Sequence, residues 1–268
     1  MGRPERTPPR PAVERILVIG WNDLGPMILD ELDDAAAAAG SVVDILADPD
    51  LVVEPNDQRS AEHRRLQVLR HDGDTGSQAN VERLLRAHTY DHVIVLCYGG
   101  LRPADADART LVTLLQLHKL IPECQPAGGA ISVVSQLLDG RDVELAKTTS
   151  TSDFVVSERL TSFILAQLAE DPERGTVLHD LFDVGGSDIS LQPATAYVEP
   201  GDEHPFSAVV EQALQYGQVA IGYRLGSAST GNDPRIVVNP PKSDVVRLTA
   251  DDQVIVISHV DADEALTA

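Results

Sequence analysis

The residues with the clearest chemical potential form a glycine-containing loop in the segment ILVIGWNDLG, residues 16–25. An apolar strand runs into Gly20, and Gly25 opens a predicted helix. Asp48 ends the next predicted strand, where dinucleotide-binding folds place an acidic residue on a ribose hydroxyl. Gly20 and Gly25 match the first and third glycines of a G-x-G-x-x-G loop, which cradles a pyrophosphate. The segment therefore predicts a nucleotide-binding fold.

The middle glycine of that loop is replaced by Asn22, which follows the bulky Trp21. Asn22 adds a Cβ and an amide where the pyrophosphate should approach the backbone, so a dinucleotide is not expected in the standard pose. An altered pocket for a mononucleotide or an ion stays open. The candidate ligand pocket comprises Gly20, Trp21, Asn22, Gly25 and Asp48, with Gly73 and Asp74 from the end of the third predicted strand. Closure of this crevice by Trp21 or other packed side chains would exclude a ligand.

Catalytic residues are not assigned by any motif in the sequence. The chain has no G-x-S-x-G elbow, no H-E-x-x-H pair and no P-loop. The segment DGDTGSQANVER, residues 72–83, starts like an EF-hand loop but has Ser77 at its sixth position and Arg83 at its twelfth. Carboxylates from distant segments can still hold calcium. Calcium is therefore an open cofactor, and metal ligands stay unassigned.

The composition narrows the class of protein. The 268 residues are 43% hydrophobic and carry a formal net charge of −21, which repels nucleic-acid backbones. Two cysteines, Cys97 and Cys124, indicate a reducing cytosol rather than a disulfide framework. No apolar run reaches the ~18–20 residues that span a bilayer.

Predicted strands and helices alternate from Arg15 to about Ser157, which is typical of a parallel sheet with helices on both faces. A helical segment follows, and the remaining chain is rich in short strands and turn signals. We therefore expect an α/β protein with four parts. These are a Pro/Arg-rich linker (1–13), a Rossmann-like lobe (14–157), a helical crossover (158–186) and a small C-terminal α+β lobe (187–268).

The predicted crossover carries an apolar stripe at helical spacing, formed by Leu160, Phe163, Ile164 and Leu168. Two interpretations are open: the stripe packs on its own lobe, or it packs on a partner.

This order of lobes resembles the regulator of K⁺ conductance (RCK) domain, and several stretches resemble the Castor/Pollux family of ion channels and their bacterial relatives. The stretches include ERILVIGWN, VVSQLLDGRDVELA, DFVVSERLTSFILAQLAED and DLFDVGGSDISLQPATAYV. The resemblance covers about residues 14–258. It implies the second, C-terminal RCK domain of such a channel, with the Pro-rich start as the join to the first.

The resemblance implies a cytoplasmic, non-catalytic module of a gating ring in a cation channel, with calcium as the ligand in plant members. The implied partners are a preceding RCK domain, a transmembrane pore and further copies in a dimer or tetrameric ring, with the apolar stripe as an interface. One alternative is an NAD-dependent oxidoreductase, which needs a cleft with an acid–base group. Another is a soluble regulatory subunit of a K⁺ uptake system, against which the Pro-rich start argues.

Overall fold

The computed structural model describes residues 13–36, 40–52, 63–125, 131–140, 153–182, 186–226 and 235–259. The predicted linker therefore lies almost wholly outside the described residues. The chain divides into two compact units, and the boundary falls between Pro172 and Glu173. This boundary lies inside the predicted helical crossover of 158–186.

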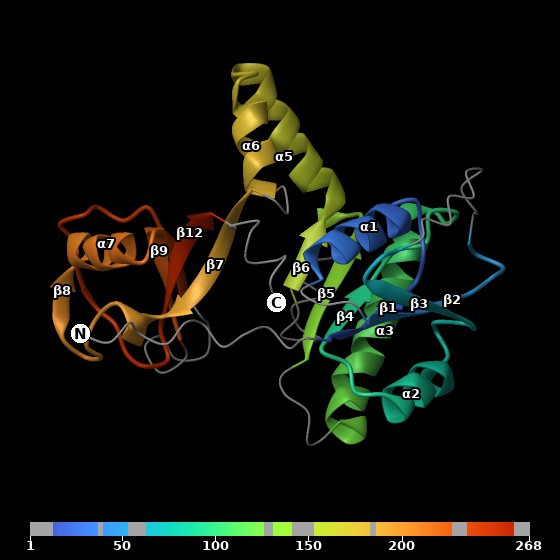
Figure 1. Cartoon of the computed structure of the whole chain (residues 1–268). Helices are drawn as coiled ribbons and strands as arrows, with labels where there is room; N and C mark the ends of the chain where they lie inside the picture. The colour runs from blue at the N-terminus through green and yellow to red at the C-terminus, as the bar shows by residue number, and fades with distance from the viewer. Residues whose placement is uncertain are drawn as a thin grey trace. The chain divides into compact units, whose positions relative to one another are not determined.

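The first unit is built on a six-stranded parallel sheet with strand order β3-β2-β1-β4-β5-β6 (Figure 1). The strands are β1 (Arg15–Ile19), β2 (Ser41–Ala47), β3 (Leu66–Asp72), β4 (His92–Val95), β5 (Ser132–Leu137) and β6 (Asp153–Val156). This is the strand order of the Rossmann fold. The predicted α/β, Rossmann-like class is confirmed.

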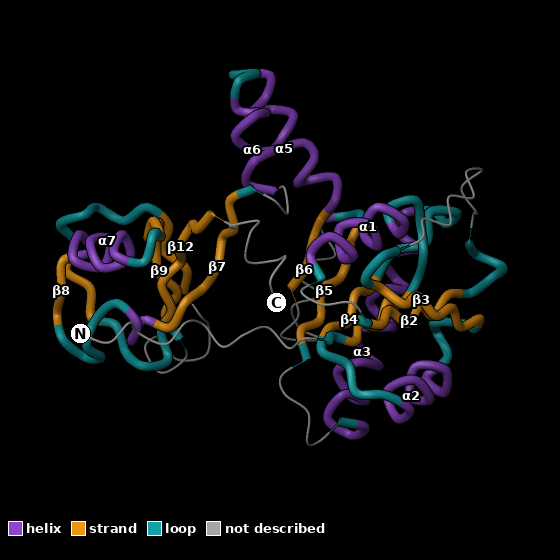
Figure 2. The backbone as a smooth tube through the Cα atoms, viewed as in Figure 1, coloured by secondary structure: helices purple, strands orange, loops and turns teal. Residues whose placement is uncertain are grey.

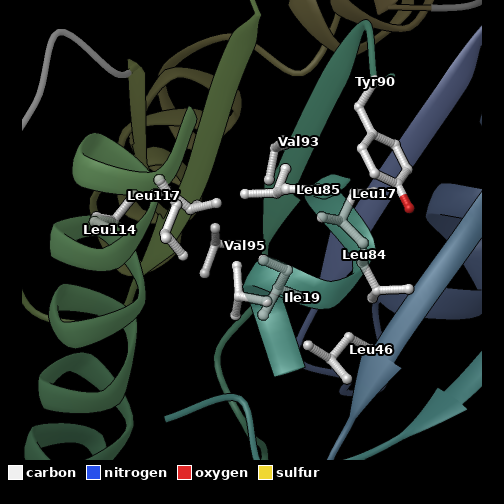
Figure 3. Close-up of a cluster of buried hydrophobic side chains, with 12 residues drawn as sticks. Leu17, Ile19, Leu46, Leu84, Leu85, Tyr90, Val93, Val95, Leu114 and Leu117 are labelled. Atoms are coloured by element: carbon white, nitrogen blue, oxygen red, sulfur yellow. The ribbon is translucent and has the colours of Figure 1, made fainter. Parts of the chain in front are cut away.

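Helices cover both faces of this sheet (Figure 2). They are α1 (Gly25–Ala35), α2 (Gln78–Ala87) and α3 (Pro103–Cys124). Alternate residues of β1 serve the two faces: Ile16 and Val18 pack in the core with Leu29 of α1. Leu17 and Ile19 pack with residues of α2 and α3, as Figure 3 shows. Burial on both faces explains why the strands read as continuous apolar runs.

The long helix α5 (Ser157–Glu170) follows β6 without an intervening residue. Val156 is the last residue of the strand and also the N-cap of the helix, with an extended backbone. The helix therefore starts at the end of the strand that pairs with β5.

The second unit contains a four-stranded antiparallel sheet of order β10-β9-β12-β7 and a two-stranded sheet, β11-β8. Its elements are α6 (Arg174–Phe182), β7 (Ser187–Pro193), β8 (Glu203–Pro205), α7 (Phe206–Gln215), β9 (Gln218–Leu225), β10 (Arg235–Val238), β11 (Val245–Arg247) and β12 (Gln253–His259). The core of this unit joins Phe206, Val209 and Ala213 of α7 to Val254 and Val256 of β12.

Gly20 sits where β1 leaves the sheet with φ +87°, in the left-handed region. A Cβ at this position would lie 2.1 Å from the carbonyl oxygen of Leu96, which is backbone and cannot swing away. The close approach lets the chain turn tightly against the segment after β4. Only glycine fits both the dihedral angle and the space.

A buried carboxylate joins the first three strands of the unit. Oδ2 of Asp44 accepts hydrogen bonds from Arg15 Nε at 2.7 Å and from the Tyr90 hydroxyl at 3.1 Å. Its Oδ1 lies 2.7 Å from His71 Nε2. Burial by itself raises the pKa of Asp44, but the hydrogen bonds from His71 and Arg15 outweigh it and hold the pKa below its usual value.

We predict that Gly20→Ala lowers the free energy of unfolding by about 3 kcal/mol or more, because left-handed strain adds to a backbone clash. Gly40 is the matched control, since it has φ +106° but its Cβ would meet only Val13 Cγ2, at 4.0 Å. Gly40→Ala should cost only the strain, about 1–2 kcal/mol. Urea unfolding measures both variants. Equal losses would show that crowding at Leu96 is unimportant.

We predict that Asp44→Asn destabilises the protein by about 3–5 kcal/mol at pH 7, because Arg15 loses its buried counter-charge. The folded-state pKa lies below the unfolded value of about 3.9, so the carboxylate contributes fully above about pH 4. That contribution is lost as the pH falls through the folded pKa. The stability gap between wild type and variant should therefore narrow below about pH 4, as measured by urea unfolding at each pH. A gap constant from pH 7 to about pH 3 would contradict this assignment.

Candidate functional site

The candidate site is the crevice at the carboxyl ends of the parallel strands, where the strand order reverses between β1 and β4. Open α/β sheets bind ligands at this place. The loop after β1 brings Gly20 and Asn22 there, and the loop after β3 brings Asp74. Asp48 follows β2, and Tyr98 lies in the loop after β4.

Asn22 bridges three segments with its carboxamide. Its Nδ2 donates to the carbonyl oxygen of Cys97 at 2.6 Å and to Gln136 Oε1, on β5, at 2.8 Å. Its Oδ1 accepts from the backbone N–H of Leu24, the N-cap residue of α1, at 2.9 Å. That N–H belongs to the helix terminus that holds phosphate in dinucleotide-binding proteins. The side chain at the middle-glycine position therefore takes up a donor that a pyrophosphate would use.

Tyr98 and Arg109 occupy the neighbouring part of the crevice. The buried Tyr98 hydroxyl accepts from the backbone N–H of Asp48 at 2.9 Å and donates to Thr75 Oγ1 at 3.3 Å. Burial raises the pKa of Tyr98, which keeps the hydroxyl protonated as a donor. The Arg109 guanidinium lies 5.9 Å from the centre of the Tyr98 ring.

Arg109 also lies between the two carboxylates of the crevice and offsets part of their negative charge. Its Nη1 donates to Asp74 Oδ1 at 3.1 Å and lies 4.0 Å from Asp48 Oδ2. Across the described ranges, no group of three or more His, Cys, Asp or Glu side chains could hold a metal ion. A cation bound between Asp48 and Asp74 would have to displace the guanidinium.

The space that remains in the crevice is small. A cavity of about 10 Å³, next to Gly20, Tyr98 and Arg109, is about the size of one water molecule. A second cavity of about 110 Å³ lies beside β2 and β3, lined by Ile45, Ala47, Pro49, Val52, Arg70, His71 and Asp72. Ligand pockets usually measure about 300–1,000 Å³. In this conformation, the space beside Gly20, Tyr98 and Arg109 is too small for a nucleotide.

The other predicted pocket residues have packing contacts. Trp21 is 2% exposed and packs in the core beneath α1, with the Arg70 guanidinium 5.0 Å from its ring centre. A Cβ on Gly25 would lie 2.6 Å from the Trp21 ring, and one on Gly73 would lie 2.8 Å from Asn80 Nδ2. The structure thus groups Gly20, Asn22, Asp48 and Asp74 around the crevice and places Trp21 in the core.

Several residues at the crevice were missed by the sequence analysis, among them Tyr98, Arg109 and Gln136. Another is Asp107 of α3, which is fully buried and accepts from the backbone N–H groups of Leu138 and Asp139 at 2.8 Å. Burial raises the pKa of the nearby Cys97 thiol to about 12, so this thiol is inert as a nucleophile. The one sequence signal for this network is the presence of polar residues inside an apolar strand and helix.

The comparison with curated proteins finds plant ion channels. The chain is 28% identical over 91% of its length to the protein called "Probable ion channel CASTOR" of Oryza sativa subsp. japonica, and 27% identical over 95% to "Probable ion channel POLLUX" of Arabidopsis thaliana. The chain is a homologue of part of these channels. It spans 30% of the length of the first relative and 34% of the second. The sequence resemblance to Castor and Pollux is confirmed.

No protein-family model matches the chain. Among solved structures, "GsuK channel bound to NAD" covers 98% of this chain at 14% identity and a TM-score of 0.42. An NADPH-dependent 3-quinuclidinone reductase from Rhodotorula rubra covers 51% at a TM-score of 0.33. Structural similarity at these TM-scores identifies neither the family nor the ligand of this chain. Among the helices that the structure describes, none is long and apolar enough to cross a membrane.

We predict that Asn22→Ala lowers the free energy of unfolding by about 2–3 kcal/mol, because it removes the hydrogen bonds that the carboxamide makes to Gln136 Oε1, to the Cys97 carbonyl and to the Leu24 N–H. Asp23→Ala is the matched control, since Asp23 is the exposed neighbour in the same loop. Thermal unfolding of both variants measures the difference. If the two variants lose equal stability, Asn22 does not tie these segments together.

Proposed function

We propose that the chain is a regulatory, non-catalytic RCK-type domain of a Castor/Pollux-like cation channel, and that it works on the cytoplasmic side of the membrane in a gating ring. The observation that carries the proposal is the match of 85–95% of this chain to about a third of several such channels. The rest of each channel is about twice as long as the matched part, which leaves room for a pore and a preceding domain.

The pairing of the polar groups inside the crevice supports a regulatory role over an enzymatic one. Its two carboxylates are paired with Arg109, and its tyrosine is held as a donor. A ligand that enters must displace Arg109 or Tyr98, so binding is coupled to a change of structure. Such coupling is what a sensor needs, because a ligand shifts an equilibrium only through different affinities for two states. In this proposal calcium is the ligand, and it replaces the guanidinium between Asp48 and Asp74.

The helix α5 supports assembly with a partner. On this helix Leu160 and Phe163 are 48% and 63% exposed, and Ile164 and Leu168 are half-buried. No side chain described on the helix, from 159 to 170, is fully buried. An apolar stripe left in water is costly, at about 1.5–3 kcal/mol for each large side chain. We propose that this stripe packs on a neighbouring domain or subunit of the ring.

For the ligand we predict that Arg109→Gln binds calcium about tenfold more tightly than the wild type, a difference of ~1.4 kcal/mol, because the competing cation is gone. Asp48→Asn in the same background should abolish the gain. Isothermal calorimetry with calcium chloride, and separately with NAD, measures both. If neither the wild type nor any variant shows a heat of calcium binding, the calcium site is refuted but the regulatory role is not. Saturable NAD binding to the wild type would refute the inference that Asn22 takes up the helix N–H that a pyrophosphate would use.

For the regulatory role we predict the behaviour of a chimera in which this chain replaces the aligned segment of the rice CASTOR relative. The chimera should conduct ions, and Phe163→Glu should reduce its flux at least tenfold, because a charge enters the packed stripe. Ser162→Glu is the matched control on the opposite side of the same helix, where the side chain is exposed. Liposome ion-flux assays measure all three. A flux that responds equally to both substitutions would contradict the proposed interface.

A further inference from the structure

The cavity of about 110 Å³ beside β2 and β3 takes no part in the proposed calcium site. The strand register shows how this cavity is built. In the pairing of β2 with β3, Ile45 is opposite Arg70 and Ala47 is opposite Asp72. Paired residues of neighbouring strands point to the same face of a sheet, so these four side chains share one face. All four residues line the cavity.

One part of the cavity lining is apolar. Ile45 is 2% exposed and packs in the core with Leu29 of α1. Ala47, Pro49 and Val52 complete the apolar lining. The cavity therefore lies on the α1 side of the sheet, and its interior accepts a hydrocarbon group rather than a polar one.

Arg70 and Asp72 bring opposite charges to the mouth of the cavity, since both residues are exposed. Within the described part of the chain, neither side chain forms an ion pair with the other or with a third residue. The Arg70 guanidinium is held against Trp21 instead, 5.0 Å from the centre of its ring. A guanidinium that stacks on a ring keeps its edge N–H groups for a carboxylate. The mouth thus offers one unpaired charge of each sign.

This pair of charges selects among classes of ligand. A simple anion is attracted by Arg70 but repelled by Asp72 and by a chain with a net charge of −21. A simple cation is attracted by Asp72 but repelled by the nearby guanidinium. A zwitterion is neutral overall and pairs with both residues at once. The mouth of the cavity is therefore complementary to a zwitterion.

We propose that this cavity binds a free α-amino acid with a small apolar side chain, such as L-valine. Its carboxylate pairs with Arg70, its ammonium group pairs with Asp72, and its side chain enters the apolar interior. A cavity of about 150 Å³ holds one benzene molecule, so this smaller cavity has room for about four carbon atoms. The α-carbon and side chain of valine supply that number, and an aromatic side chain is too large. The site does not depend on the proposed calcium site or on the proposed channel role.

The test is a titration of the ¹⁵N-labelled whole chain with L-valine, followed by two-dimensional NMR. The titration extends to about 20 mM, well above a Kd of about 1 mM. Two analogues of valine keep one charge each: 3-methylbutanoate lacks the ammonium group, and 2-methylpropylamine lacks the carboxylate. L-Phenylalanine keeps both charges and tests the size of the cavity.

Three variants test the assignment of the residues. Arg70→Gln and Asp72→Asn each remove one charge from the mouth. Ala47→Leu fills the cavity and leaves both charges in place. Arg83→Gln is the matched control, because Arg83 is an exposed arginine of α2, the helix that packs on the other face of the sheet. Thermal unfolding shows that each variant is folded.

The expected result is saturable binding of L-valine that each of the three variants weakens at least tenfold, while Arg83→Gln changes it less than twofold. Both analogues and L-phenylalanine should bind at least tenfold more weakly than valine. No saturable binding of valine to the wild type overturns the proposal. Binding that all three variants retain overturns it as well, because the ligand then lies elsewhere. If 3-methylbutanoate binds as tightly as valine, the cavity is a carboxylate site and the amino-acid proposal is wrong.

Discussion

The hydrogen bonds of the Asn22 carboxamide are the interactions on which the carboxyl end of the Rossmann-like sheet depends. They hold the first turn of α1, the loop after β4 and the side chain of Gln136 on β5 in one network. In a nucleotide-binding protein of this fold, the ligand itself bridges the same places. Here the protein supplies the bridge, so the end of the sheet is complete without a ligand. The tight turn at Gly20 and the burial of Trp21 under α1 follow from the same close packing.

The parallel, Rossmann-like class of this unit could be predicted from the sequence because local signals agree with the global fold. Alternating strands and helices imply right-handed parallel crossovers, and Gly20 and Gly25 mark the turn into α1. The contents of the crevice could not be predicted in the same way. Asn22 and Gln136 are 114 residues apart in the chain, and nothing local says that they meet. Tyr98 and Arg109 read as parts of an apolar strand end and a polar helix start, so their place over Asp48 emerges only in three dimensions.

Among the residues that the structure describes, the buried carboxylates of this acidic chain hold together segments that are distant in sequence. Asp44 joins three strands, and Asp107 holds the chain where β5 ends. In the second unit, Asp252 accepts from the backbone N–H groups of Thr249 and Gly226 at 2.6 and 2.7 Å. Each of the three is fully buried and surrounded by donors. A buried carboxylate is tolerated when its hydrogen bonds are complete, and each then fixes segments that are distant in sequence.

Because no loop separates β6 from α5, the helix continues directly from the last strand of the sheet. Val155 of β6 is paired with Gln136, which binds Asn22, so the helix is mechanically continuous with the crevice. A helix of 14 residues is about 21 Å long at 1.5 Å per residue. A tilt of about 5° at its base would then carry its tip through about 2 Å. A small rearrangement at the end of the sheet would thus be delivered, enlarged, to whatever the far end of the helix touches.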